Sequence, residues 1–207
     1  MQAYDAVTAL VVVDVQNDFA DPDGGLSVPG GDAIVTALNE EIAAAGEAGA
    51  TVVYTQDWHP ETTPHFAKDG GIWPVHCVRD TWGAEFHPAL EVVGPIVRKG
   101  TNGEDGFSGF TMRDPTSDET IPTELEELLR TRQIERVLVA GLATDYCVKA
   151  TALDAAQLGF ATVFLGDLAA AVDLEPGDGD RAIDEMREAG VSVETAAPGS
   201  RPNRARR

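Results

Sequence analysis

Short apolar stretches rich in β-branched residues alternate along this chain with amphipathic stretches rich in Ala, Leu and Glu. The apolar stretches cover residues 9–15, 51–55, 95–97, 137–140, 162–165 and 191–193, and the amphipathic ones cover residues 33–48, 123–130, 145–157 and 179–189. This alternation is typical of a parallel sheet with helices packed on both of its faces. We therefore predict an α/β fold, a doubly wound and mainly parallel six-stranded sheet.

The length and composition of the chain fit one domain. A chain of 207 residues with 43% hydrophobic residues can bury a core without disulfides or metals to hold it together. We place the domain at residues 1–195 and predict a disordered tail at 196–207, where no apolar period is present. Two stretches without helical or strand periodicity, residues 58–88 and 100–122, are predicted to be functional loops.

The net charge excludes several classes of partner. The chain carries 35 acidic against 15 Lys and Arg residues, a formal charge of −20, so its surface should repel nucleic acid and anionic membranes. Such an acidic surface suits a cell with a high internal salt concentration, or it reflects a compositional bias of the genome. The first apolar run, residues 6–15, is too short to span a bilayer and no basic segment precedes it, which predicts a cytoplasmic protein. The composition is compatible with a homo-oligomer.

Polar residues follow four of the predicted strands. Asp14 ends the first strand, Asp57 and His59 follow the second, Lys99 follows the third, and Cys147 lies just after the fourth. Alone, each has a simple structural explanation as a turn former, a surface cation or a small buried residue. Parallel strands place their carboxyl ends at one edge, where α/β proteins bind ligands. A thiol at a helix N-terminus beside a lysine should be readily ionised, so the group predicts a nucleophilic site.

Three of the four histidines lie in the loop at residues 58–88. Asp57 and His59 can chelate a metal from one extended segment, and His76 can complete the shell while leaving positions open for water or substrate. His65 is as readily explained as a surface residue as it is as a fourth ligand. The chain's other cysteine, Cys77, is interpreted as packing beside this site.

These motifs together resemble the isochorismatase-like hydrolases, and within them the nicotinamidases, from about residue 8 to about residue 194. The resemblance rests on residues 13–19 (VDVQNDF), 56–59 (QDWH) with 65–66 (HF), 72–77 (IWPVHC), 99–100 (KG) with 108–110 (SGF), and 141–148 (GLATDYCV). It implies hydrolysis of nicotinamide to nicotinate and ammonia through a thioester.

The resemblance also implies roles for individual residues. Asp14, Lys99 and Cys147 would form a catalytic triad, and the amides of Ala143 and Cys147 would form an oxyanion hole beside a cis peptide bond that precedes Ala143. Phe19 and Trp73 would contact the substrate ring. One divalent metal ion, zinc, iron or manganese, would anchor the pyridine nitrogen. The ligands implied for it are Asp57, His59 and His76, with His65 as a further candidate.

Other functions remain open alternatives. The segment 100–110 has Phe107 where many relatives carry tyrosine before the serine, so its substrate preference could differ. A cysteine amidohydrolase of the same superfamily acting on another small amide or a ureido substrate would share the triad but normally lacks the metal shell. A flavin or redox domain would need a Gly-rich phosphate loop after its first strand, where residues 14–18 read DVQND instead. A non-catalytic scaffold is the least supported alternative.

Overall fold

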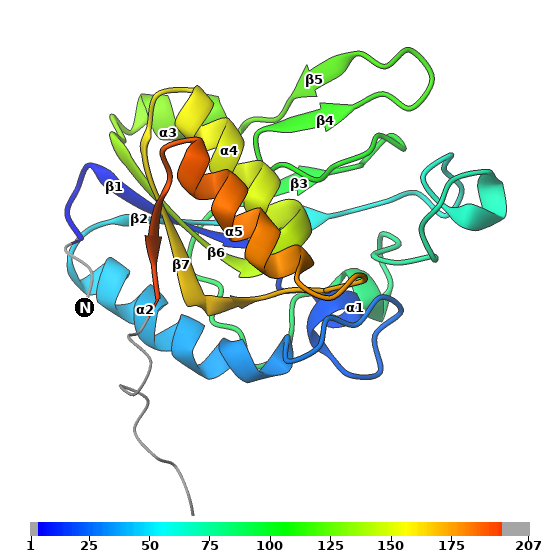
Figure 1. Ribbon diagram of the computed structural model, residues 1–207, viewed down its shortest axis with the longest axis horizontal. Helices are drawn as coiled ribbons and strands as arrows, with labels where there is room; N and C mark the ends of the chain where they lie inside the picture. Colours follow the sequence, from blue (N-terminus) through cyan, green and yellow to red (C-terminus); the bar gives the residue numbers. More distant parts are fainter. Residues whose placement is uncertain (1–3, 196–207) are drawn as a thin grey trace, which may run out of the picture.

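A six-stranded parallel sheet forms the centre of the molecule. The computed structural model describes residues 4–195, and within them the sheet has the strand order β3-β2-β1-β6-β7-β8 (Figure 1). The strands are β1 (Thr8–Val13), β2 (Thr51–Asp57), β3 (Ile96–Lys99), β6 (Arg136–Leu142), β7 (Ala161–Ala170) and β8 (Ser192–Glu194). Each pairs in parallel with its neighbours. The predicted fold class is confirmed.

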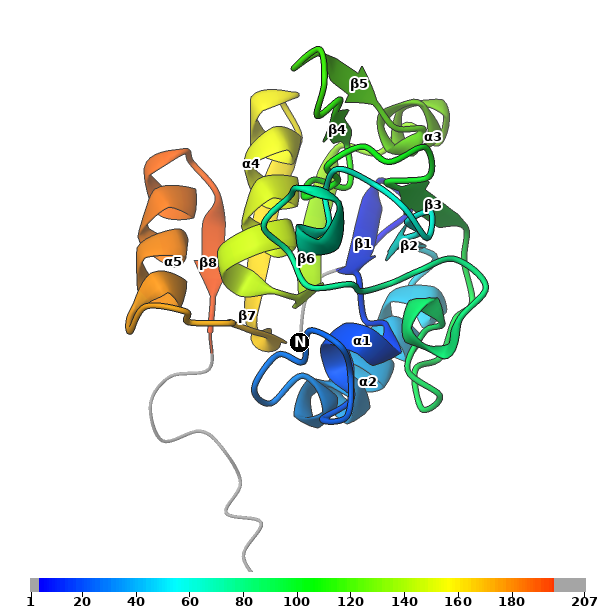
Figure 2. The same ribbon diagram turned by 90° about the vertical axis from the view of Figure 1, so that its right-hand side faces the viewer.

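Helices cover both faces of the sheet (Figures 1 and 2). They are α1 (Asn17–Ala20), α2 (Val35–Glu47), α3 (Leu125–Thr131), α4 (Lys149–Gln157) and α5 (Asp178–Glu188). The residues of β1 alternate between two cores, since Leu10 and Val12 pack with α2 and the flanking residues Val11 and Val13 pack with α3, α4 and α5. Because a strand buried on both faces has to be apolar on both, β1 is a nearly continuous run of apolar residues.

The direction of winding reverses between β1 and β6. From β1 the chain moves outward through β2 to the edge strand β3, then returns to the other side of β1 and moves outward through β6, β7 and β8. In such sheets the crevice at the reversal point, outside the carboxyl ends of the strands, is where ligands bind. Residues 58–80 extend beyond this edge, on the right in Figure 1 and toward the viewer in Figure 2, and the chain then returns along the sheet to the start of β3.

Three features differ from the sequence prediction. Residues 100–122 were predicted to be loop throughout, but they contain an antiparallel hairpin of β4 (Thr111–Arg113) and β5 (Thr120–Pro122). The short helix α1 was not predicted. Strand β7 is longer than the predicted 162–165, because it continues past a register shift opposite Gly141.

No helix among residues 4–195 is both long and apolar enough to cross a bilayer. The predicted tail at 196–207 lies outside the described residues, and the domain boundaries of 1–195 and the cytoplasmic location stay predictions.

Candidate active site and metal cluster

Lys99 lies at the centre of the candidate site, at the end of β3. Its side chain is fully buried, and its ammonium group lies 2.7 Å from Oδ2 of Asp14 and 2.5 Å from Oδ1 of Asp57. It also donates to the carbonyl of Gly106 and lies 3.8 Å from Sγ of Cys147. Although burial alone would lower the pKa of Lys99, the carboxylates of Asp14 and Asp57 raise it well above its usual value. The ammonium is therefore charged at neutral pH.

Asp14 projects from the end of β1 in an unusual backbone conformation. Its φ is 49°, which few non-glycine residues adopt and which often marks functional positions. Its Oδ1 accepts a hydrogen bond of 2.6 Å from the hydroxyl of Thr55 on β2. Complete burial raises the pKa of Asp14 to about 6, although Lys99 opposes that shift. A carboxylate with this pKa can exchange a proton near neutrality, as a general base must.

Cys147 lies on the π-helical turn Thr144–Val148 that joins β6 to α4. The peptide bond between Leu142 and Ala143 just before this turn is cis, as the resemblance implied. Upstream, Gly141 has a φ of 114° and a Cβ there would collide with the carbonyl of Val13 on β1, so only glycine lets β6 approach β1 this closely.

The ionisation of Cys147 differs from the sequence prediction. Burial raises the pKa of the Cys147 thiol well above its usual value, and Asp14 and Asp57 raise it further, while Lys99 opposes them. The prediction of a readily ionised thiol was wrong because the sequence did not reveal how deeply Sγ is buried. One oxygen each of Asp14 and Asp57 and this sulfur lie within 4.8 Å of one another. The resting thiol thus has a base beside it.

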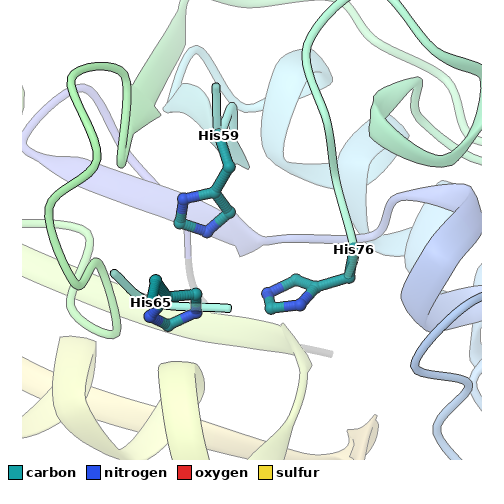
Figure 3. Close-up of side chains that lie close together, drawn as sticks. All are labelled: His59, His65 and His76. Carbon is teal, nitrogen blue, oxygen red and sulfur yellow. The ribbon is translucent and has the colours of Figure 1, made fainter. Parts of the chain in front are cut away.

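A cluster of three buried imidazoles lies next to this group. One nitrogen each of His59, His65 and His76 lies within 4.8 Å of the others, and Figure 3 shows the rings turned toward a shared space. The ring centroid of His59 is 4.6 Å from that of His65 and 5.2 Å from that of His76. His59 can approach the end of β3 so closely because Gly100 has no side chain, and a Cβ there would meet the imidazole.

The protonation of these imidazoles suits a divalent cation. Burial lowers the pKa of His65 and lowers that of His76 to about 4, so both are neutral at pH 7, the form that binds metals. Nδ1 of His76 lies 2.7 Å from the carbonyl of Pro74, and Nδ1 of His65 lies 2.6 Å from Oδ1 of Asp105. These acceptors require a proton on Nδ1, which leaves Nε2 as the free donor atom.

Asp57 belongs to both groups of side chains. Its Oδ1 pairs with Lys99, whereas its Oδ2 lies 3.8 Å from Nε2 of His59. Burial would raise the pKa of Asp57, but Lys99 and His59 lower it well below its usual range, so the group is ionised. Two ligands of one tetrahedral ion lie about 3.3 Å apart when each bond is about 2.0 Å, so a small adjustment would let both bind the same ion. The donor set of imidazoles and one carboxylate fits zinc, iron or manganese.

A pocket opens above these two groups. Its lining includes Asp57, Cys147, His65 and His76, so the thiol and two of the three imidazoles face one cavity. The rings of Trp73 and Tyr146 meet edge to face at 5.2 Å. The side chains that form its apolar wall include Phe19, Leu26, Val28, Trp73, Phe107, Tyr146, Val172 and Leu174. Such a cavity fits a small flat ring with one polar substituent.

Comparison with known proteins identifies the family. Residues 8–198 match the isochorismatase domain family. The chain belongs to the isochorismatase family. It is 37% identical to the nicotinamidase of Escherichia coli, over 91% of this chain and 95% of that protein. A zinc complex of the pyrazinamidase of Pyrococcus horikoshii superimposes with a TM-score of 0.81 at 41% identity, covering 91% and 99%. A nicotinate complex of PnC1 from L. infantum superimposes with a TM-score of 0.84 at 36% identity, covering 94% and 96%.

Within this isochorismatase-family fold, the predicted site residues lie together. Lys99 contacts both Asp14 and Cys147, whose carboxylate and sulfur lie within 4.8 Å of each other. Phe19 and Trp73 line the pocket, and Ala143 borders it beside Cys147. His65, for which the sequence left two explanations open, lies buried in the imidazole cluster. The residues that the sequence analysis did not find are Thr55, Asp105 and the pocket residues Leu26, Val28, Tyr146 and Leu174. Only Tyr146, next to Cys147 in the sequence, carried a signal that could have revealed it.

Proposed function

We propose that this chain hydrolyses nicotinamide to nicotinate and ammonia. Relatives of 37% and 40% identity from E. coli and Mycobacterium tuberculosis are a nicotinamidase and a nicotinamidase/pyrazinamidase. The observation that carries the proposal is the position of Lys99, whose buried ammonium contacts Asp14, Asp57 and Cys147, the last two of which line an apolar pocket. A thiol, a base of suitable pKa and a fixed positive charge are the groups that covalent amide hydrolysis needs.

In the first half of the reaction, the thiol becomes the nucleophile. Ionised Asp14 takes the proton from Sγ of Cys147 while the ammonium of Lys99 stabilises the resulting thiolate. The sulfur then attacks the carboxamide carbon, forming a C–S bond and moving charge to the carbonyl oxygen. Backbone N–H groups of Ala143 and Cys147 would hold that oxyanion, at about 3–4 kcal/mol for each donor. Asp14 returns its proton to the nitrogen as the C–N bond breaks, and ammonia leaves.

In the second half, water resolves the thioester. Asp14, ionised again, removes a proton from a water molecule, and the oxygen attacks the thioester carbon. The C–S bond breaks, nicotinate is released, and Cys147 recovers its proton from Asp14. The raised pKa of Asp14, about 6, suits both proton transfers, since the carboxyl group must accept and donate in each cycle.

We propose that Asp57, His59, His65 and His76 hold one divalent ion, with zinc, iron and manganese as the candidates. The neutral imidazoles of His65 and His76 and the ionised carboxylate of Asp57 line one pocket, and the imidazole of His59 lies beside them, which supports this assignment. When bound, the ion supplies a Lewis-acidic anchor for an aromatic ring nitrogen. Phe19 and Trp73 line the same pocket and would orient the ring, so that the carboxamide lies over Cys147.

The decisive experiment is ammonia release by the purified chain supplied with zinc, iron or manganese in turn. Nicotinamide and pyrazinamide should both be hydrolysed, and an N-carbamoyl amino acid should not. Lys99→Met should abolish turnover because it removes the charge that stabilises the thiolate. Hydrolysis of the carbamoyl compound with no release from nicotinamide would favour the ureido alternative and overturn the proposal.

A further inference from the structure

Asp105 connects the imidazole cluster with the β4–β5 hairpin. One of its carboxylate oxygens lies 2.6 Å from Nδ1 of His65, and the other lies 3.6 Å from the guanidinium of Arg113 on β4. The residue lies in the segment 100–110, and neither the catalytic groups nor the metal ligands proposed above include it. Its side chain is 18% exposed, so the contact with His65 is largely shielded from water.

The chemistry of this contact fixes the state of His65. An ionised carboxylate can only accept hydrogen bonds, so Nδ1 of His65 must carry the proton and Nε2 must present its lone pair. Neighbouring rings restrain the plane of the His65 imidazole, because His59 stacks on it at a centroid distance of 4.6 Å and an interplanar angle of 19°, and the ring of Trp73 lies at 6.3 Å and 25°. With its tautomer and its plane both fixed, the His65 ring can direct the lone pair of Nε2 toward a metal ion in one direction only.

The backbone around Asp105 holds the carboxylate in place. The amides and carbonyls of Asp105 and Arg113 exchange two hydrogen bonds of 2.8 Å, so the segment pairs with β4 as a short antiparallel bridge. On the opposite side, the hydroxyl of Thr63 donates to the carbonyl of Gly103 at 2.9 Å, which joins the same segment to the loop that carries His65. Both ends of the Asp105–His65 contact are therefore fixed by neighbouring backbone.

The three imidazoles differ in the group that their Nδ1 atoms contact. Nδ1 of His76 lies against a neutral carbonyl, that of Pro74, and Nδ1 of His59 is buried without a hydrogen-bond partner among the described residues. His65 is thus the one member of the cluster whose Nδ1 contacts a carboxylate in the described part of the chain. A carboxylate on the distal nitrogen of an imidazole raises the basicity of the ligating nitrogen, and such partners typically change metal affinity by about 10–100-fold.

We propose that Asp105 is a positioning residue of the metal site, which fixes the tautomer of His65 and strengthens the binding of a divalent cation. This inference rests on the metal site of the proposed function. Through Asp105, the segment that also carries the pocket residue Phe107 is joined to the cluster. A metal ion in the cluster and an ordered pocket wall therefore support each other.

The experiment is a zinc competition titration against a fluorescent chelator, carried out in the Cys147→Ala background so that the thiol cannot act as a competing zinc ligand. Asp105→Ala should weaken zinc binding by about 10–100-fold. Asp105→Asn keeps an acceptor but loses the charge, so it should fall between wild type and Ala. Arg113→Gln, which removes the other ionic partner of Asp105 and leaves His65 untouched, should bind zinc like the parent protein.

A double-mutant cycle separates this role from general damage to the fold. In a His65→Ala background, Asp105→Ala should cause no further loss of zinc affinity, because its effect passes through His65. Unchanged affinity in Asp105→Ala, or an undiminished loss in the His65→Ala background, would overturn the inference. A wild-type chain that binds zinc but releases no ammonia would overturn the proposed activity alone. A chain that releases ammonia but binds none of zinc, iron and manganese would overturn the metal site and the role of Asp105 alone.

Discussion

At the scale of single residues, the surroundings of Lys99 explain how a charged side chain is tolerated in the interior. A buried charge is costly unless it is paired and hydrogen-bonded. This ammonium donates hydrogen bonds to oxygens of Asp57 and Gly106 and forms an ion pair of 2.7 Å with Oδ2 of Asp14, so two carboxylates compensate its charge. The sulfur of Cys147, at 3.8 Å, then lies beside a positive charge that cannot move away. Loss of either carboxylate would leave the ammonium less compensated.

The two cysteines give a direct test of the nucleophile. Cys147→Ala should abolish ammonia release from nicotinamide, because no other described thiol lies beside Asp14 and Lys99. Cys77 is also buried, but its sulfur faces the carbonyl of Gly83 at 3.9 Å, so Cys77→Ala should keep at least part of the activity. Initial rates and mass spectrometry of trapped acyl-enzyme check both variants. Near wild-type turnover by Cys147→Ala would rule out the covalent route.

The raised pKa of Asp14 predicts how activity depends on pH. Because the free enzyme needs ionised Asp14 to accept the thiol proton, kcat/KM should be at its plateau above this pKa and decrease as the pH falls through about 6. An ordinary aspartate would place the decrease near 4. Bound metal should be measured over the same range, since histidine protonation could also release the ion. A decrease below pH 5 only, with metal retained, would contradict the assignment of Asp14 as the base.

The sequence revealed those site residues that follow strands. The proximity of Asp14, Lys99 and Cys147 could be predicted from the sequence, because the carboxyl ends of parallel strands meet at one edge of the sheet. Asp105 could not be found in this way, since its contact with His65 depends on the path of an irregular loop. The ionisation of Cys147 was predicted in the wrong direction, because a motif records neighbours along the chain and says nothing about depth of burial.

At the scale of elements, the length of a periodic pattern decided what could be predicted. The strands of the main sheet were each marked by apolar runs, and α2 by apolar residues three and four apart, at Val35, Leu38, Ile42 and Ala45. Strands β4 and β5 have three residues each, too few for alternation to be recognised, and α1 has only four. The extension of β7 follows from the register shift beside Gly141, a feature of tertiary pairing.

Strand β6, which leads to the turn that carries Cys147, depends on Gly141 for its close approach to β1. Gly141→Ala should destabilise the fold by more than the roughly 1–2 kcal/mol that a left-handed conformation costs alanine, because its Cβ would also collide with Val13. Gly159→Ala is the matched control, since Gly159 has a φ of 86° and open space around it. Urea unfolding of both variants isolates the effect of the collision. Equal losses of stability would show that β1 and β6 can move apart freely.

At the scale of the whole molecule, the candidate site joins the two halves of the sheet. Asp14, Asp57 and Lys99 come from β1, β2 and β3 on one side of the winding reversal, and Cys147 follows β6 on the other. The imidazole cluster is supplied by the long segment between β2 and β3, which closes over the same edge. An ion held there would therefore connect a loop with few regular elements to the rigid sheet, and its effect should extend to global stability.

This coupling leads to a prediction about metal removal. Because the four proposed ligands, Asp57, His59, His65 and His76, converge only in the folded chain, zinc should stabilise the native state by mass action. The expected gain is about 2.7 kcal/mol when free zinc is one hundred times its dissociation constant. Treatment with a chelator should lower the unfolding midpoint and ammonia release together, and added zinc should restore both. His59→Ala should lose this response, whereas His87→Ala should keep it, since the His87 side chain hydrogen-bonds the amide of Ala89 outside the cluster. A chelated chain with unchanged midpoint and unchanged turnover would show that the imidazole cluster is structural.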